Sequence, residues 1–212
     1  AFFGVVISLL AYELGMLLKK KFGLPIFNPL LISIAVVIVF LAVFDIDYQN
    51  YNDGAKYLSY LLTPATVCLA IPLYEQMEAL KKNIKAIFAG ILSGVLTSLT
   101  VVLALALIFN LNHKMYVTLL PKSITTAIGM GVSEELGGAV TITVAVIIIT
   151  GVLGNMLAET LCKLFHIEEP IAKGISIGSA SHAIGTAKAM EMGDVEGAMS
   201  SLSIAVAGIL TV

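Results

Sequence analysis

The chain contains no arginine, and its twelve basic residues are all lysines. A bidentate contact between a guanidinium and an anion is therefore excluded, so any anion site must use lysine, histidine, hydroxyl groups or helix N-termini. Charge is scarce as well. Asp, Glu, Lys and Arg make up 12% of the 212 residues, about half the share in a soluble domain. The formal net charge of −2 gives no sign of nucleic-acid binding.

Clusters of catalytic or metal-binding residues are also missing. Cys68 and Cys162 each stand alone in an apolar run, without the spacing of a metal or redox site, and are expected to be packing residues. Neighbouring carboxylates occur at Glu134 and Glu135, but no nucleophile or metal-ligand cluster accompanies them. The sequence therefore predicts a protein that is not an enzyme and has no cofactor or metal.

Hydrophobic residues form 58% of the chain. They fall into runs near the ~20 residues that a helix needs to cross a bilayer. We predict an all-α polytopic membrane protein with about eight segments in a single transmembrane domain, residues 1–212. Segments 57–80, 115–135 and 171–190 are interrupted by Pro, Gly, Ser, Thr or Lys and are expected to be broken or re-entrant. The full set is 1–18, 28–44, 57–80, 84–109, 115–135, 139–165, 171–190 and 197–212.

Lysine placement predicts how the chain enters the membrane. Lys19–Lys21 follow the first run, whereas the loop Asp45–Asp53 has no lysine. Because cytoplasmic loops carry an excess of lysine, the first run is expected to end in the cytoplasm and the loop to lie outside. This pattern predicts a multi-pass protein of the cytoplasmic membrane.

The two halves of the chain resemble each other. Leu31–Phe40 (LISIAVVIVF) aligns with Thr141–Thr150 (TITVAVIIIT) at an offset of 110, and each half continues from a clean apolar helix into a broken one. Shared Val and Ile content is the alternative explanation. A duplication predicts repeats 1–112 and 113–212. The two repeats are parallel if every segment crosses the membrane. They are inverted if one segment in each half is re-entrant, and we favour the inverted arrangement. Transporters built this way bind solute where the broken elements meet.

The segment Leu120–Glu135 (LPKSITTAIGMGVSEE) is a candidate anion site. Pro121 removes a backbone donor and can break the helix, which exposes N–H groups on the next turn. A lysine and three hydroxyls beside a helix N-terminus suit a small carboxylate. Lys122 would otherwise extend to a membrane interface. The predicted substrate-binding residues here are Lys122, Ser123, Thr125 and Thr126.

The segment Gly174–Glu196 is small, polar and ionisable within an otherwise apolar chain. Lipid cannot form hydrogen bonds with unpaired backbone N–H and C=O groups, so such a stretch at membrane depth must face protein or a water-filled cavity. His182 is the candidate for proton coupling, because imidazole titrates near neutral pH; its alternative role is packing. Lys188 is expected to pair with Glu191 or to cap the helix C-terminus; binding of solute is the alternative. We predict helix breaks at Gly178 and Gly185 and substrate contacts from Ser181, His182 and Thr186.

Two further breaks are expected in the first half. Pro64 and Pro72 interrupt one apolar segment, a poor arrangement for a lipid-facing helix. Thr66 between them is a predicted cavity residue. Asn28 before Pro29 is a further substrate-binding candidate, although helix N-capping is the alternative.

Five motifs carry a family resemblance. They are Asn28-Pro-Leu, Leu62-Thr-Pro-Ala-Thr-Val, Ile71-Pro-Leu-Tyr, Pro121-Lys-Ser-Ile-Thr-Thr and Gly178-Ser-Ala-Ser-His-Ala-Ile-Gly-Thr-Ala-Lys. With these the chain resembles the LrgB/CidB family of bacterial membrane proteins along most of its length. One departure is Lys188, where arginine is common in the family.

The resemblance implies two functions. Family members look like antiholin-like partners of small holin-like proteins of the LrgA/CidA type, which control murein hydrolase activity and autolysis. A plastid relative resembles a glycolate/glycerate carrier, and bacterial pairs are implicated in pyruvate movement. We favour a secondary transporter of small monocarboxylates (glycolate, glycerate, lactate or pyruvate), with a proton as the coupling ion, and keep the antiholin-like regulator as the alternative. A homodimer is expected, packed through Gly90 and Gly94 and through Gly151 and Gly154.

Overall fold

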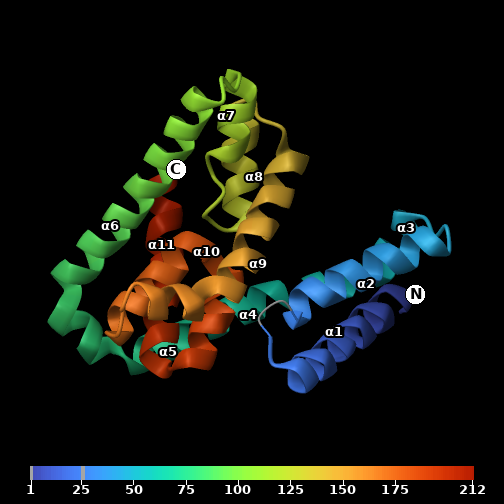
Figure 1. Cartoon of the computed structure of the whole chain (residues 1–212), viewed down its shortest axis with the longest axis horizontal. Helices are drawn as coiled ribbons and strands as arrows, with labels where there is room; N and C mark the ends of the chain where they lie inside the picture. The colour runs from blue at the N-terminus through green and yellow to red at the C-terminus, as the bar shows by residue number, and fades with distance from the viewer. Residues whose placement is uncertain (1, 25–26) are drawn as a thin grey trace. The chain divides into compact units, whose positions relative to one another are not determined.

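The computed structural model of the protein describes residues 2–24 and 27–212, apart from the side chains of Leu62, Thr63 and Thr66. The described residues contain no β-strand, which confirms the all-α class. The helices are α1 (Phe3–Phe22), α2 (Pro29–Val43), α3 (Tyr48–Ser59), α4 (Leu62–Cys68), α5 (Ala70–Glu75), α6 (Met77–Ile108), α7 (His113–Leu119), α8 (Thr126–Glu135), α9 (Val140–Leu164), α10 (Pro170–Met192) and α11 (Asp194–Thr211) (Figure 1).

The chain divides into two compact units, Ala1–Cys68 and Leu69–Val212. This boundary differs from that of the predicted repeats at residue 112, so the repeats stay a prediction. In the first unit α1 ends at Gly23, whose φ of 64° forms a left-handed cap. The chain returns as α2, which begins with Pro29. A Cβ on Gly15 of α1 would lie 2.8 Å from the backbone of Pro29, so glycine permits the close contact of α1 and α2.

In the second unit, α6, α10 and α11 form the main core. Ile87, Ile91 and Val95 recur every four residues on α6 and are buried. They pack with residues of α10 and α11, including Ile175 and Met199. Gly178 of α10 lies against the backbone of Ser200 in α11. Small residues thus allow the helices to approach closely, as in membrane helix packing generally.

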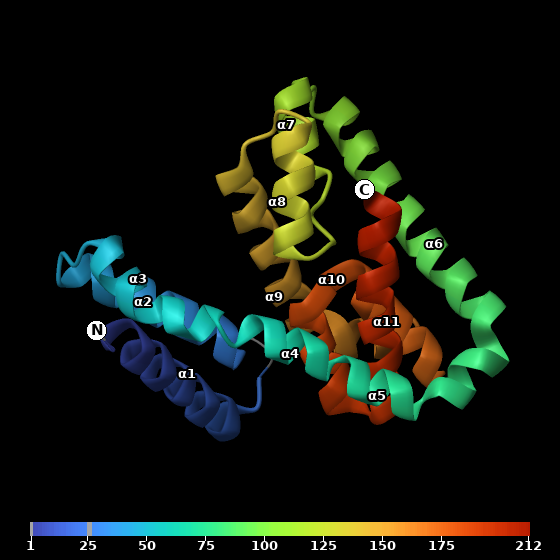
Figure 2. The ribbon, with the colours of Figure 1, turned by 180° about the vertical axis from the view of Figure 1, so that it is seen from behind.

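The predicted segment 115–135 lies in a helical hairpin, called the first hairpin, which consists of α7, α8 and the loop between them (residues 113–135). Its two short helices lie beside the start of α9 (Figures 1 and 2). Thr143 of α9 holds them, because its hydroxyl lies 2.9 Å from the Thr118 oxygen and 2.7 Å from Ser133 Oγ. The segment therefore folds back on itself and is not one helix, which confirms the predicted interruption, whereas re-entry into a membrane stays a prediction.

Helix α10 is a second hairpin (residues 170–192), visible as an arch in Figure 2. His182 has φ 42° and ψ −143°, outside helical geometry. After it the chain folds back, so that a Cβ on Gly185 would lie 3.3 Å from the Ile177 oxygen. Residues eight apart in a straight helix are about 12 Å apart. The break lies at His182, and not at Gly178 or Gly185 as predicted, because these glycines serve close helix packing instead.

Two described helices, α6 and α9, are long and apolar enough to cross a membrane. α2 is apolar but has only 15 residues. The segment predicted at 57–80 is interrupted as expected: it contains the end of α3 and the short helices α4 and α5. Pro64 and Pro72 each lie in the first turn of a short helix, where proline is tolerated. The count of eight spans stays a prediction.

Candidate functional site

The tip of the first hairpin is the six-residue loop between α7 and α8. Pro121 starts the turn, and its oxygen accepts a hydrogen bond from the Ile124 nitrogen at 3.4 Å. Thr125 then adopts an extended conformation and precedes α8. Pro121 and Ser123 are buried, whereas Lys122 is half-buried. The proline and the extended residue thus leave Lys122 within the loop that precedes α8.

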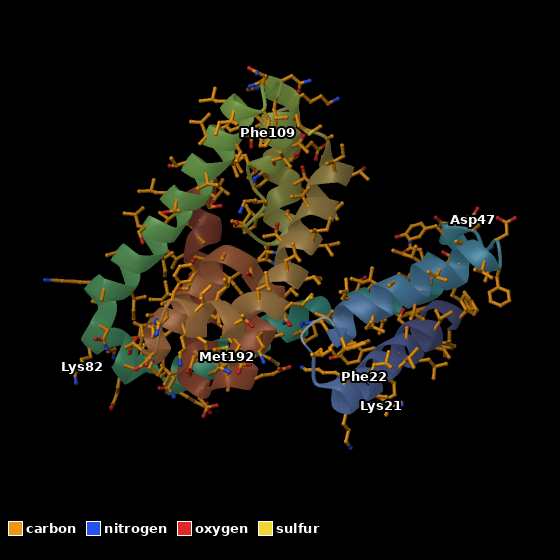
Figure 3. All side chains as sticks on the ribbon, in the orientation of Figure 1. Lys21, Phe22, Asp47, Lys82, Phe109 and Met192 are labelled. Carbon is orange, nitrogen blue, oxygen red and sulfur yellow. The ribbon has the colours of Figure 1, made fainter. Side chains whose placement is uncertain are left out.

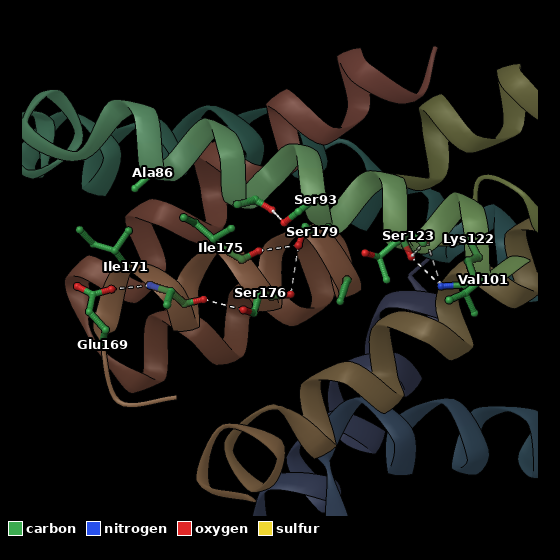
Figure 4. A pocket seen from close by; sticks show the side chains of 16 residues that line it. Ala86, Ser93, Val101, Lys122, Ser123, Glu169, Ile171, Ile175, Ser176 and Ser179 are labelled. Carbon is green, nitrogen blue, oxygen red and sulfur yellow. Dashed lines mark hydrogen bonds between the residues drawn. The ribbon is translucent and has the colours of Figure 1, made fainter. Parts of the chain in front are cut away.

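Lys122 is held by two hydroxyl groups. Its Nζ donates to Ser123 Oγ at 2.9 Å and lies 3.4 Å from Ser98 Oγ on α6. The Ser98 hydroxyl in turn donates to Ser123 Oγ at 3.1 Å. Figure 4 shows Lys122 and Ser123 next to α6. These three side chains form the Lys122–Ser123–Ser98 cluster.

The first half of the second hairpin reaches the same face of α6, just before the turn at His182. A Cβ on Gly94 would lie 2.8 Å from Ser179 Oγ, and Gly94 is one helical turn from Ser98. Ser98, Ser123 and Ser179 also line one small cavity. The two hairpins, far apart in sequence, therefore bring a lysine and three hydroxyls together.

A groove of about 600 Å³ runs along α6 and the first half of α10. Lys122 lies at one end and Glu169 at the other (Figure 4). The Glu169 carboxylate accepts a hydrogen bond from the Ala172 nitrogen at 2.7 Å and so caps α10. The Lys122 ammonium thus lies among hydroxyl groups, at the opposite end of the groove from Glu169, the only carboxylate among the described residues that line it. The polar groove residues are Ser93, Thr97, Ser98, Lys122, Ser123, Glu169, Ser176 and Ser179.

The cluster lies near the middle of an uncharged stretch of α6. Lys82 and Phe109 lie towards opposite ends of this helix (Figure 3). No charged residue occurs from residue 86 to 108, and Ser98 is about 15 Å along the axis from Ile108. The hydrocarbon core of a bilayer is about 30 Å thick. If α6 spans it, Lys122 lies near the bilayer midplane and not at an interface.

His182, Ser181 and Thr186 face away from the groove. His182 Nε2 lies 2.9 Å from the Ile147 oxygen of α9, and Ser181 packs against Gly154. Thr186 Oγ1 donates to the His182 oxygen at 3.0 Å and lies 2.6 Å from Ser200 Oγ. All three are buried. The structure thus gives these predicted substrate residues contacts that stabilise the second hairpin.

The other candidates are dispersed. Thr125 and Thr126 are half-buried at the start of α8 and do not line the groove. Asn28 caps α2, accepting from the Leu30 nitrogen at 2.9 Å; this matches the alternative reading. The Thr66 side chain lies outside the described residues. Sequence reasoning missed Ser98, which lies within a clean apolar helix.

The glycine pairs predicted to form a homodimer make contacts within the chain. Gly90 faces Ile175, and Gly94 faces Ser179; Gly151 faces His182. A homodimer through these faces is therefore a wrong expectation, whereas dimerisation itself stays a prediction. The expected ion pair of Lys188 with Glu191 is confirmed at 3.3 Å.

Comparison with known proteins identifies relatives along the whole chain. The LrgB-like family model matches residues 8–212. "Antiholin-like protein LrgB" from Bacillus mycoides (strain KBAB4) is 41% identical over 212 residues, covering all of this chain and 92% of the relative. The proteins of the same name from Bacillus cereus (strain B4264) and Bacillus anthracis (strain CDC 684 / NRRL 3495) show the same identity and coverage. No solved structure matches.

Proposed function

The chain belongs to the LrgB family, a family of membrane proteins, and we propose that it is a secondary transporter of small monocarboxylates. The observation that supports this most is the Lys122–Ser123–Ser98 cluster, in which a half-buried lysine is held between the tip of the first hairpin and α6. A charge at mid-membrane costs ~2.5–3.5 kcal/mol on insertion scales. A lysine there is readily explained if it neutralises an anion.

In this proposal the groove binds a glycolate-, glycerate-, lactate- or pyruvate-like anion. The ammonium of Lys122, which lines the groove, bonds the carboxylate. The hydroxyl group of Thr97, which lines the groove, bonds the hydroxyl or oxo group of the solute. Ser179 Oγ, which donates to the Ile175 oxygen at 2.7 Å, accepts a hydrogen bond from a solute hydroxyl. One cation among several hydroxyls suits a single carboxylate bearing a neutral polar group.

Transport then requires the site to open to one side at a time. The two hairpins are the elements we expect to move, against α6 and α9. Broken helices meeting at the membrane centre are the usual position of solute sites in such carriers. His182 holds the tip of the second hairpin and is the residue at which we place proton coupling. A proton there changes the contact between α10 and α9, without His182 touching the solute.

Uptake of radiolabelled glycolate or pyruvate into proteoliposomes tests the proposal. Wild-type protein is expected to accumulate the solute, and Lys122→Gln to reduce uptake at least tenfold, because it removes the cation. Lys114→Gln is the matched control, since Lys114 is exposed on α7. Uptake that is equal in the wild type, in Lys122→Gln and in protein-free liposomes would reject the transporter.

A second candidate function is antiholin-like regulation, as the name of the relatives indicates. In this case the protein binds a small LrgA/CidA-like membrane protein and restrains murein hydrolase activity. Function would then depend on outward faces, such as those of Leu92 and Leu96, which are exposed. The name supports this candidate directly, whereas the groove supports transport. Autolysis assays of cells carrying Leu92→Ala or Lys122→Gln separate the two, because only the transporter requires Lys122.

A further inference from the structure

Hydroxyl groups on α6 differ in their hydrogen-bond partners. Ser93 Oγ donates to the Gly90 oxygen at 2.8 Å, and Thr100 Oγ1 donates to the Leu96 oxygen at 2.7 Å. Such bonds to the preceding turn are the ordinary way a helix satisfies its own Ser and Thr side chains. Ser98 donates instead to Ser123, a residue of the first hairpin. Its hydroxyl thus joins α6 to the hairpin tip.

The Ser98 hydroxyl also accepts a hydrogen bond from Lys122. An ammonium has three N–H donors, and the oxygens of Ser98 and Ser123 are acceptors for two of them. The remaining N–H is available to a carboxylate in the groove, which Lys122 lines. Two acceptors on one ammonium restrict the direction of the long side chain.

We propose that Ser98 is a positioning residue, which holds Lys122 in place for the solute through its bonds to Lys122 and Ser123. The inference rests on the proposed function and names a residue outside the family-like motifs. Lysine has a flexible four-carbon stem and loses considerable freedom when it is fixed. Without Ser98 the ammonium can extend away from the groove. Binding would then have to order the side chain as well as the solute.

Transport kinetics in proteoliposomes test this role. Ser98→Ala is expected to raise the apparent KM for glycolate or pyruvate about tenfold, the loss expected for a hydrogen bond to a charged group, with Vmax changed less than twofold. Ser98→Thr keeps the hydroxyl and is expected to restore KM to within threefold of wild type. Thr100→Val is the matched control, since its hydroxyl bonds its own helix, and should leave both constants unchanged.

A second measurement does not depend on transport. Labelling of Lys122 by a small amine-reactive reagent, followed by mass spectrometry, is expected to be several times faster in Ser98→Ala than in wild type or Thr100→Val. Equal labelling rates in all three proteins would overturn the role of Ser98, even if Lys122→Gln abolishes uptake. If Ser98→Ala is labelled faster but the wild-type protein transports no carboxylate, Ser98 still positions Lys122. In that case the proposed transport function is rejected instead.

Discussion

The imidazole Nε2 of His182 lies 2.9 Å from the backbone oxygen of Ile147, which ties the tip of the second hairpin to α9. Ile147 also contacts the first hairpin, because a Cβ on Gly129 would meet its side chain. Both hairpins therefore rest on one residue of α9. This residue lies well inside the uncharged stretch 140–158 of the helix.

Replacing His182 is expected to loosen the second hairpin. Its backbone has φ 42° and its side chain is 2% exposed, so the bond to Ile147 helps to hold an unfavourable conformation. His182→Ala should lower the free energy of unfolding by ~1–3 kcal/mol, measured by thermal or denaturant unfolding in detergent. His166→Ala is a matched control, because His166 also has a positive φ, 54°, but is exposed. Equal losses from both substitutions would contradict a specific role for the Ile147 bond.

Glycine at position 154 is expected to be required for the hairpin to pack on α9. A Cβ there would overlap the side chain of Ser181, so Gly154→Ala should destabilise the protein by ~1–3 kcal/mol. A Cβ on Gly131 of α8 would have no neighbouring atom within 4 Å. Gly131→Ala is therefore the control and should be neutral or slightly stabilising. The measurement is unfolding in detergent, combined with size-exclusion chromatography. A changed oligomeric state at unchanged stability would instead indicate that Gly154 lies in a subunit interface.

The ion pair between Lys188 and Glu159 links the return half of the second hairpin to α9. Its atoms are 3.3 Å apart, and the Lys188 side chain is 19% exposed. Lys188→Gln should cost less than ~1 kcal/mol of stability but increase hydrogen exchange in residues 183–192. Lys163→Gln serves as control, since Lys163 binds Glu159 within α9 itself and is 76% exposed. The same exchange in both variants would show that Lys188 does not restrain the hairpin.

Local chemistry in the sequence predicted part of the site. Pro121 with the following polar residues indicated the first break, and Lys122 and Ser123 do line the groove. The second break was placed at glycines, although the chain turns at His182. Glycine marks either a bend or a close helix contact, and a sequence does not say which helix approaches.

Ser98 shows why the rest of the site was not predictable. It lies in a clean apolar stretch, where a lone serine normally bonds its own helix. Its partners, Ser123 and Lys122, are 25 and 24 residues away, and the contact exists only because the first hairpin returns alongside α6. Similarly, His182 and Thr186 follow polar neighbours in sequence, yet the reversal of α10 turns them away from the groove.

Ligand stabilisation offers a direct test of anion binding at the groove. A ligand that binds only the folded protein at 100 times its Kd stabilises it by ~2.7 kcal/mol, so glycolate or pyruvate should raise Tm in detergent by several degrees. Ethylene glycol, which lacks the carboxylate of glycolate, should not. Lys122→Gln should remove the carboxylate shift, whereas Lys114→Gln on α7 should preserve it, because bulk charge changes equally in both variants. A shift that survives Lys122→Gln would place the anion elsewhere, since the Lys122 ammonium is the only cationic group that lines the described groove.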